Sequence, residues 1–125
     1  MTHPIQELWC KQIKKEYPEY FKNKKVIDIG SLDINGNNRG LFTNCEYIGV
    51  DVIPGKNVDI VSIAHKLEFN NESFDVIIST NALEHDMYFP LTMKKMYNLL
   101  KPNGLLFFTA AHKWKEHGTI HKEVG

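Results

Sequence analysis

Two acidic residues and one glycine have the types and spacing to bind the ribose of a nucleoside. Asp28 and Gly30 end one run of β-branched residues, and Asp51 ends a second run twenty-one residues after Gly30. A carboxylate there can accept two hydrogen bonds from a ribose diol, and a glycine lets the backbone approach the ligand closely. Taken alone, Gly30 fits a simple strand-to-loop turn equally well, and Asp51 fits a cap or turn before Pro54 equally well. Together they favour a bound nucleoside.

The loop after Gly30 indicates which ligand fits. A nicotinamide dinucleotide needs the pattern G-x-G-x-x-G opening directly into a helix, so that backbone N–H groups meet the pyrophosphate. Residues 30 to 36 read GSLDING, with only the first glycine in register, and the Asp33 carboxylate would repel a pyrophosphate. A ligand with a cationic, phosphate-free centre suits these carboxylates better. S-adenosylmethionine has such a centre, because it carries an ammonium and a sulfonium.

The elements that would position these residues alternate between buried strands and helical crossovers. Continuous β-branched runs predict strands buried on both faces, and apolar residues at three- and four-residue spacing predict helices. Strands are expected at 26–30, 47–52, 58–63, 74–79 and 105–111, helices at 4–22 and from Pro90, a short helical stretch at 39–42 and a turn at 101–104. Pro18 is expected to interrupt the last turn of the first helix. Because parallel neighbours need long crossovers, the pattern predicts a parallel α/β sheet whose ligands sit beyond the carboxyl ends of the strands.

Composition and charge limit the class of protein. The 125 residues carry fifteen Lys and Arg against fifteen Asp and Glu, so the chain lacks the basic excess of a general nucleic-acid binder. They suffice for one domain, with a helical segment at 1–23, a core at 25–111 and a tail at 112–125. No apolar stretch reaches the length of a membrane span, and the first residues lack the apolar core of a signal peptide. A cytoplasmic protein is therefore expected.

Four segments of the sequence carry a family resemblance. In order they are VIDIG at 26–30, YIGVD at 47–51, FDVIISTNALEH at 74–85 and LLKPNGLL at 99–106. In order and spacing they closely resemble the class I S-adenosylmethionine-dependent methyltransferases, most of all the small-molecule type with a Glu-His after the fourth strand. The resemblance implies a Rossmann-like three-layer αβα sandwich, with a mostly parallel sheet of about five strands in the order 3-2-1-4-5.

The resemblance also implies roles for single residues in holding the cofactor. Asp28 would help to hold the methionine ammonium, Gly30 would lie under the ligand, and Asp51 would bind the ribose hydroxyls. Val52 would contact the adenine, and Asn81 would line the methionine side. The full candidate set for cofactor binding is Asp28, Gly30, Ser31, Asp33, Asp51, Val52, Ala64, His65 and Asn81.

Two departures from the family pattern change these expectations. Leu32 and Ile34 stand where the family's loop usually has glycines, so this loop is expected to take a different path. Ile63 stands where relatives commonly have an acid for the adenine amino group. Backbone groups around Ala64 and His65 would then recognise the adenine.

Two histidines are the candidate catalytic bases. Methyl transfer from a sulfonium is an in-line displacement, so the protein mainly positions the acceptor, excludes water and, where needed, supplies a base. An imidazole at His85, just past the fourth strand, would reach an acceptor hydroxyl or amine. The alternative is that His85 pairs with Glu84 and the loop backbone. His117, or His112 in its place, is the second candidate, in a segment that would form a lid over the acceptor.

No metal site is predicted. The spacing of His112, His117 and His121 could hold zinc, but no cysteine or fixed helix supports it, and a flexible polar tail is the commoner meaning of such a segment. Cys10 and Cys45 have no metal-ligand spacing and are expected to be buried or half-buried free thiols.

The sequence therefore predicts methyl transfer from S-adenosylmethionine to a small-molecule, sugar-linked or lipid-linked acceptor. The alternative is a non-catalytic cofactor-binding or scaffold module of the same fold, completed by dimerisation or a partner chain. Methyltransferases of this class usually have two further strands, which are not expected here. The apolar fifth strand would then present an unpaired edge at 105–109, which soluble proteins avoid. The chain is thus expected to be a fragment or natural truncation, or to cover that edge as a homodimer.

Overall fold

The computed structural model describes residues 4–33, 37–80, 87–110 and 116–121. Its helices and short 3-10 turns are α1 (Pro4–Glu16), η1 (Pro18–Phe21), η2 (Arg39–Leu41), η3 (Ala64–Lys66) and α2 (Phe89–Leu99). Its strands are β1 (Lys25–Ile29), β2 (Glu46–Asp51), β3 (Ile60–Val61), β4 (Phe74–Thr80), β5 (Leu100–Ala110) and β6 (Glu116–His121). These strands form a sheet in the order β3-β2-β1-β4-β5-β6.

β1 lies in the middle of the sheet because its side chains suit burial on both faces. It pairs in parallel with β2 on one side and with β4 on the other, and the parallel pairing continues to β3 and to β5. Val26 and Ile27, which face opposite sides of the pleat, are both fully buried. The predicted order 3-2-1-4-5 of the parallel strands is therefore confirmed.

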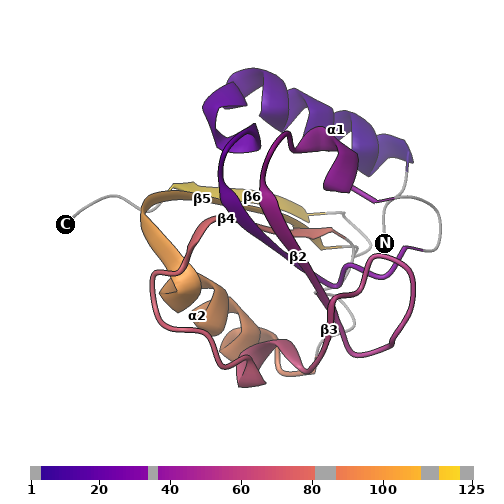
Figure 1. The fold of residues 1–125 in the computed structure, drawn as a ribbon, viewed down its shortest axis with the longest axis vertical. Helices are drawn as coiled ribbons and strands as arrows, with labels where there is room; N and C mark the ends of the chain where they lie inside the picture. Colours follow the sequence, from indigo (N-terminus) through magenta and orange to yellow (C-terminus); the bar gives the residue numbers. More distant parts are fainter. Residues whose placement is uncertain (1–3, 34–36, 81–86, 111–115, 122–125) are drawn as a thin grey trace.

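Helices cover both faces of this sheet, as Figure 1 shows. α1 packs on one face, where Cys10 and Ile13 join a buried cluster with Val26. α2 packs on the other face, where Met96 and Leu99 join a second buried cluster with Ile27. The structure is thus the predicted Rossmann-like three-layer αβα sandwich.

The N-terminal helical segment divides into two parts, which confirms the interruption that the sequence predicted at Pro18 in the helix over residues 4–22. α1 ends at Glu16, and η1 begins at Pro18. Proline has no N–H to continue the α-helical hydrogen bonding, which explains the break.

Within the described ranges, no helix has the length and apolar character needed to cross a membrane. Cys10 is a buried free thiol and Cys45 a half-buried one.

The predicted turn at 101–104 lies inside β5. The strand begins at Leu100, directly after α2, and its pairing with β4 shifts from Phe74↔Leu100 to Val76↔Leu105. The extra residues form a bulge in which Asn103 has a φ of 64°, a left-handed conformation that asparagine tolerates. The turn residues therefore make an irregularity within the strand, and β5 starts earlier than predicted.

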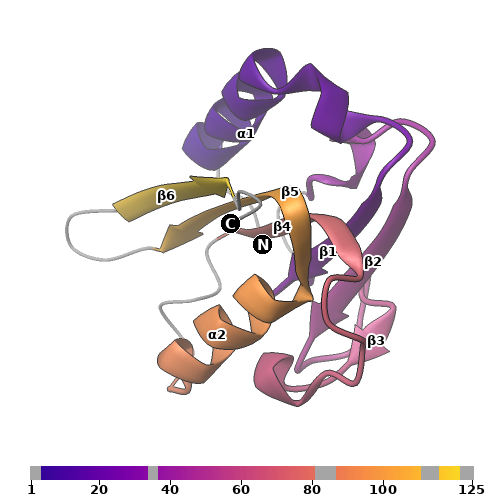
Figure 2. The ribbon, with the colours of Figure 1, turned by 90° about the vertical axis from the view of Figure 1, so that its left-hand side faces the viewer.

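β5 does not form an edge of the sheet. Residues 116–121, predicted to belong to a polar tail, form β6, which pairs antiparallel with β5 from Leu105↔His121 to Ala110↔Glu116. Figure 2 shows β6 alongside β5, at the opposite end of the sheet from β3. The prediction of an unpaired edge at 105–109 is wrong, because the same chain supplies the strand that pairs with it. The ground for a homodimer through this edge is therefore lost.

Candidate functional site

Asp28, predicted to hold a cationic group, is a buried carboxylate one residue before the end of β1. It is 2% exposed. The Tyr47 hydroxyl donates a hydrogen bond to Asp28 Oδ2, whereas Asp28 Oδ1 is buried and has no hydrogen-bond partner among the described residues. Burial raises the pKa of Asp28 to about 6. The described neighbours of Asp28 therefore donate a hydrogen bond to one of its two carboxylate oxygens and leave the other without one.

Asp51, predicted to bind ribose hydroxyls, is a half-buried carboxylate fixed by main-chain donors. The Leu32 N–H donates to Asp51 Oδ2 over 3.0 Å, and the Ile53 N–H donates to Asp51 Oδ1 over 3.1 Å. These bonds orient both oxygens and tie the loop after β1 to the end of β2. Each oxygen retains a further lone pair that can accept a ligand hydroxyl.

The loop after β1 begins with two main-chain hydrogen bonds to β2. The N–H groups of Gly30 and Ser31 both donate to the carbonyl oxygen of Val50, over 2.7 and 2.9 Å. Gly30 has a φ of 81°, in the left-handed region that favours glycine. The loop therefore turns sharply at Gly30, the residue predicted to lie under the ligand.

Ser31 contributes to this loop by binding the connection between β2 and β3. Its hydroxyl donates to the Asn57 carbonyl over 2.7 Å, and the Asn57 side-chain amide donates to the Ser31 carbonyl over 2.9 Å. Gly49 makes room for this exchange, because a Cβ there would lie 2.1 Å from the Asn57 oxygen and 2.6 Å from Ser31 Oγ. The Ser31 hydroxyl is thus already used within the protein.

Asp33, a further candidate for cofactor binding, has partners of its own. The Asn37 side-chain amide donates to Asp33 Oδ2 over 2.6 Å, and Lys56 Nζ lies 3.6 Å from the same oxygen. The Asp33 N–H also donates to the Lys56 carbonyl. Lys56 compensates part of the negative charge of Asp33. Asp33 is therefore expected to attract a ligand cation less strongly than Asp28 does.

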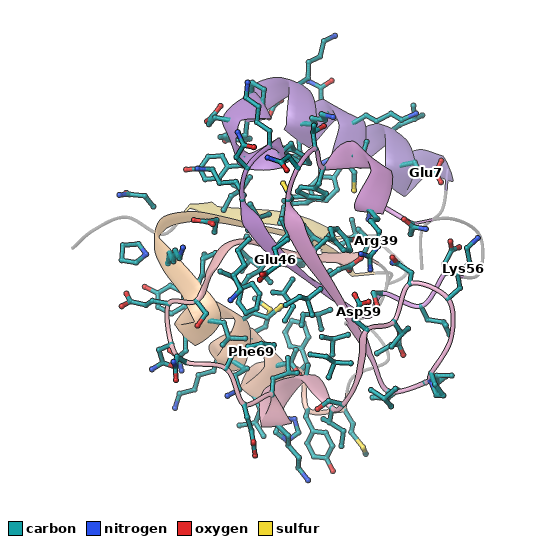
Figure 3. The ribbon with its side chains drawn as sticks, viewed as in Figure 1. Glu7, Arg39, Glu46, Lys56, Asp59 and Phe69 are labelled. Carbon is teal, nitrogen blue, oxygen red and sulfur yellow. The ribbon has the colours of Figure 1, made fainter. Side chains whose placement is uncertain are left out.

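Arg39 joins these loops to one another, and the sequence analysis did not single it out. Its guanidinium donates to Asn57 Oδ1 over 2.7 Å and to Asp59 Oδ2 over 2.8 Å. It also donates to the Tyr47 carbonyl over 3.2 Å and lies over the Tyr47 ring, 4.5 Å from its centroid. Arg39 and Asp59 are both labelled in Figure 3. Nothing in the local sequence marks these contacts, because they join residues that only the fold brings together.

The predicted adenine side lies at the carboxyl ends of β2 and β3. Val52, directly after β2, is 60% exposed, and Ile63, at the start of η3, is also exposed. Ala64 and His65 belong to η3, and the His65 ring centroid lies 4.8 Å from that of Tyr88. His65 Nδ1 is buried and has no hydrogen-bond partner in the described part of the chain. The side chain of His65 therefore carries a buried polar atom that its described neighbours leave without a hydrogen bond.

Buried polar side chains also join the carboxyl ends of β1 and β4. The Ser79 hydroxyl donates to the Ile29 carbonyl over 2.8 Å, and the Asn38 amide donates to Thr80 Oγ1 over 3.3 Å. Ser79, Thr80 and Asn38 are all buried. The sequence analysis missed them, although the change from apolar to polar residues at the end of the fourth strand was a usable signal.

The two candidate bases and Asn81 are described only in part. Asn81 and His85 fall outside the described residues. The main chain of His117 lies in β6 opposite Thr109, one residue before the end of β5. The register thus brings the backbone of His117 to the end of the sheet where Asp28 and Asp51 lie. Within the described ranges, no group of three His, Cys, Asp or Glu residues is placed to hold a metal ion.

The chemistry of these groups fits the predicted cofactor. Among the described residues, Asp28 Oδ1 and His65 Nδ1 are the buried side-chain polar atoms without a hydrogen-bond partner, and both residues were predicted to contact it. Buried polar atoms nearly always have a partner, and ligands of parallel α/β sheets bind at this end of the strands. A buried acid suits an ammonium, a second acid suits a ribose diol, and an exposed valine and a histidine with an unpaired ring nitrogen suit an adenine.

Fold and site together define a Rossmann-like domain of the methyltransferase type. Residues 1–119 match the sequence model of the methyltransferase domain family. The chain therefore belongs to that family. No curated protein sequence matches it.

Several solved structures share this fold at low sequence identity. A protein of Galdieria sulphuraria assigned as a sarcosine dimethylglycine methyltransferase is 17% identical, with a TM-score of 0.68 over 82% of this chain and 45% of that one. An assigned S-adenosyl-L-methionine-dependent methyltransferase of Methanococcus maripaludis is 16% identical, with a TM-score of 0.67 over 86% and 56%. Haemonchus contortus phosphoethanolamine N-methyltransferase 2, solved with phosphomonomethylethanolamine and S-adenosylhomocysteine, is 22% identical, with a TM-score of 0.62 over 80% and 28%. The chain spans about half the length of the first solved proteins it matches.

Proposed function

We propose that this chain binds S-adenosylmethionine and takes part in methyl transfer to a small-molecule, sugar-linked or lipid-linked acceptor. One observation carries the proposal. The buried polar atoms without a partner in the described structure belong to Asp28 and His65, at opposite ends of the predicted cofactor site. Membership of the methyltransferase domain family supports the same ligand.

In this proposal each side of the ligand meets a residue of matching chemistry. Asp28 would hold the methionine ammonium, and Asp51, oriented by Leu32 and Ile53, would accept hydrogen bonds from the ribose hydroxyls. His65 and the exposed Val52 would bind the adenine. When bound, the cofactor supplies an activated methyl group on a sulfonium. The chain's own task is to orient that group toward the acceptor and to exclude water.

The proton of an acceptor hydroxyl or amine would pass to a histidine. His85 follows β4 in the sequence, and the main chain of His117 lies in β6 opposite Thr109, near the carboxyl end of β5. An imidazole titrates near neutral pH, which suits a general base. His85→Gln and His117→Gln, each compared with the unmodified chain, would identify the base by the loss of turnover without loss of cofactor binding.

Acceptors to test first are small amines, because two of the similar solved proteins carry the names of such substrates. The protein of Galdieria sulphuraria is named for sarcosine and dimethylglycine, and that of Haemonchus contortus for phosphoethanolamine. Release of S-adenosylhomocysteine in the presence of each amine would measure turnover.

The alternative function is a cofactor-binding module without turnover by itself. The chain covers 45% and 56% of two similar methyltransferase structures, so the likeness to them extends over about half of each. Binding of S-adenosylmethionine without release of S-adenosylhomocysteine from any acceptor would favour this alternative. Turnover with one acceptor would exclude it.

Calorimetry of S-adenosylmethionine binding tests the premise that both functions share. Asp51→Ala removes the ribose acceptor and should weaken binding by about tenfold or more. Asp75→Ala is the matched control, because Asp75 lies at the start of β4, at the other end of the sheet, and binds the Lys25 N–H and Lys101. No heat of binding with the unmodified chain would contradict both functions.

A further inference from the structure

Tyr47 is the hydrogen-bond donor to Asp28 in the described structure. Its hydroxyl lies 2.5 Å from Asp28 Oδ2. The two residues are not direct partners in the sheet, because Tyr47 pairs with Val26 and Asp28 pairs with Gly49. The contact is therefore diagonal, and it depends on the length of the tyrosine side chain. It ties the acid of β1 to the neighbouring strand.

The ring of Tyr47 is fixed on more than one side. The Arg39 guanidinium lies 4.5 Å from its centroid and donates to the Tyr47 carbonyl, and the Phe42 ring lies 5.5 Å away. Arg39 is in turn held by Asp59 and Asn57. Tyr47 is itself 9% exposed. The hydroxyl is thus presented to Asp28 by a side chain that has little freedom to move.

Charged and titratable groups of the described residues approach Asp28 from several elements. Burial, the largest influence, raises the pKa of Asp28 to about 6, and the Tyr47 hydrogen bond opposes this rise. Arg39 of η2 acts in the same direction as Tyr47, and Asp51 at the end of β2 acts against them. On α1, burial raises the pKa of Cys10 to about 12, so this thiol stays neutral beside the acid. Burial also raises the pKa of Tyr47 well above its ordinary value, so its hydroxyl remains a donor.

We propose that Tyr47 is a positioning residue for cofactor binding: its hydroxyl keeps the Asp28 carboxylate ionised and oriented so that Oδ1 receives the ligand's ammonium. The proposal rests on the proposed function, because the ammonium is that of S-adenosylmethionine. A neutral Asp28 attracts a cation far less than a charged one. Tyr47 therefore sets the lower end of the pH range in which the chain binds its cofactor.

Tyr47→Phe tests this by removing the hydroxyl and keeping the ring under Arg39. Two measurements are made across about pH 5 to 9, the carbon-13 NMR shift of the Asp28 carboxyl in the free protein and the calorimetric affinity for S-adenosylmethionine. A hydrogen bond to a charged group is worth about tenfold in ionisation, so the variant's Asp28 midpoint should rise by about one pH unit. Affinity should fall near neutral pH and converge with that of the unmodified chain at the highest pH.

Two further variants make the outcome decisive. Tyr20→Phe is the matched control, because Tyr20 donates its hydroxyl to the Asn103 carbonyl, away from the site, and its loss should leave both measurements unchanged. Asp28→Asn keeps an acceptor for Tyr47 without a charge, and should bind weakly with no change in affinity through the range where Asp28 titrates. If Tyr47→Phe does not fold, Asp28→Asn still tests whether the charge of Asp28 sets the pH dependence of the affinity.

Two results would overturn the proposal. One is an unchanged Asp28 midpoint in Tyr47→Phe, and the other is an affinity loss of the same size at every pH, which a purely structural role would give. If Asp28→Asn binds as tightly as the unmodified chain, the proposal is also wrong. If no protein binds S-adenosylmethionine, the proposed function fails, whereas the titration of the free protein still decides whether Tyr47 keeps Asp28 ionised.

Discussion

Asp28 and Asp51 stand at the ends of neighbouring parallel strands, yet the chain treats the two carboxylates differently. Asp28 is 2% exposed, receives a side-chain hydrogen bond at one oxygen and has its pKa raised to about 6 by burial. Asp51 is half-buried, and each of its oxygens accepts a main-chain N–H. The difference shows that two acids at equivalent strand ends can have unlike surroundings, so residue type and strand position alone do not determine the chemistry of each carboxylate. In the proposed function, Asp28 would attract the charge of the ligand's ammonium, and Asp51 would accept hydrogen bonds from the ribose hydroxyls.

Gly49→Ala should have the largest effect, because it disturbs the loops that surround Asp51. A Cβ there meets the Asn57 main chain at 2.1 Å, so Gly49→Ala must displace the β2–β3 connection or the Ser31 loop. We expect the free energy of unfolding to fall by about 3 kcal/mol, as for overpacked cores, with weaker cofactor binding. Urea unfolding measures the change.

Gly40→Ala is the matched control for that substitution. A Cβ at Gly40 in η2 has open space around it, with nothing within 4 Å. Its stability should stay within about 0.5 kcal/mol of the unmodified chain. Equal losses from the two substitutions would show that the packing around Gly49 does not hold the loops together.

Asp28→Asn should change how stability depends on pH. The folded pKa of Asp28 is raised to about 6, so between its unfolded value and about pH 6 the folded chain binds more protons than the unfolded one. The contribution of Asp28 to stability is therefore present at low pH and is lost as pH rises through about 6. Relative to the unmodified chain, Asp28→Asn should gain about 2–3 kcal/mol between about pH 4 and pH 7.

Asp59→Asn supplies a comparison of opposite sign. The Gly49 N–H and Arg39 lower the pKa of Asp59, so its contribution is present above the unfolded value and is lost as pH falls. Thermal unfolding across the same pH range should show the two variants diverging from the unmodified chain in opposite directions. Parallel curves would contradict the assignment of Asp28 as a buried acid with a raised pKa.

His65→Phe should have little effect on stability and a clear effect on binding. The substitution keeps an aromatic ring beside Tyr88 and removes the unpaired buried Nδ1. We expect stability to be unchanged or higher by about 1 kcal/mol, with S-adenosylmethionine affinity lower by about tenfold. Unchanged affinity by calorimetry would remove His65 from the cofactor site.

The sequence predicted the parallel strands because their signal is local, whereas their order followed from the family resemblance. The runs that became β1, β2 and β4 are dense in β-branched residues, and a family resemblance linked them. The strand β6 gave no such signal, since EHGTIH is mostly polar and becomes a strand by pairing with β5. Pairing with β5, a tertiary contact, thus made residues 116–121 a strand although their local propensity did not.

The positions of the candidate site residues at strand ends were also predictable in part. Asp28, Gly30 and Asp51 lie at the predicted carboxyl ends of strands, because strand ends can be read from single residues. Tyr47 was interpreted as one more apolar strand residue, because its diagonal contact with Asp28 exists across two strands and not along one. Arg39 was missed for the same reason, since its partners lie eight to twenty residues away on other elements.

The central claim is that the carboxyl ends of β1 to β3 form a site for S-adenosylmethionine. The most direct test is an NMR titration of the nitrogen-15-labelled chain with this ligand. If the ligand binds there, the amide signals of Gly30, Val52 and His65 shift together and saturate, while those of Lys25 and Asn103, at the opposite end of the sheet, stay in place. Saturable shifts confined to the opposite end, or no shifts at any concentration, would contradict it.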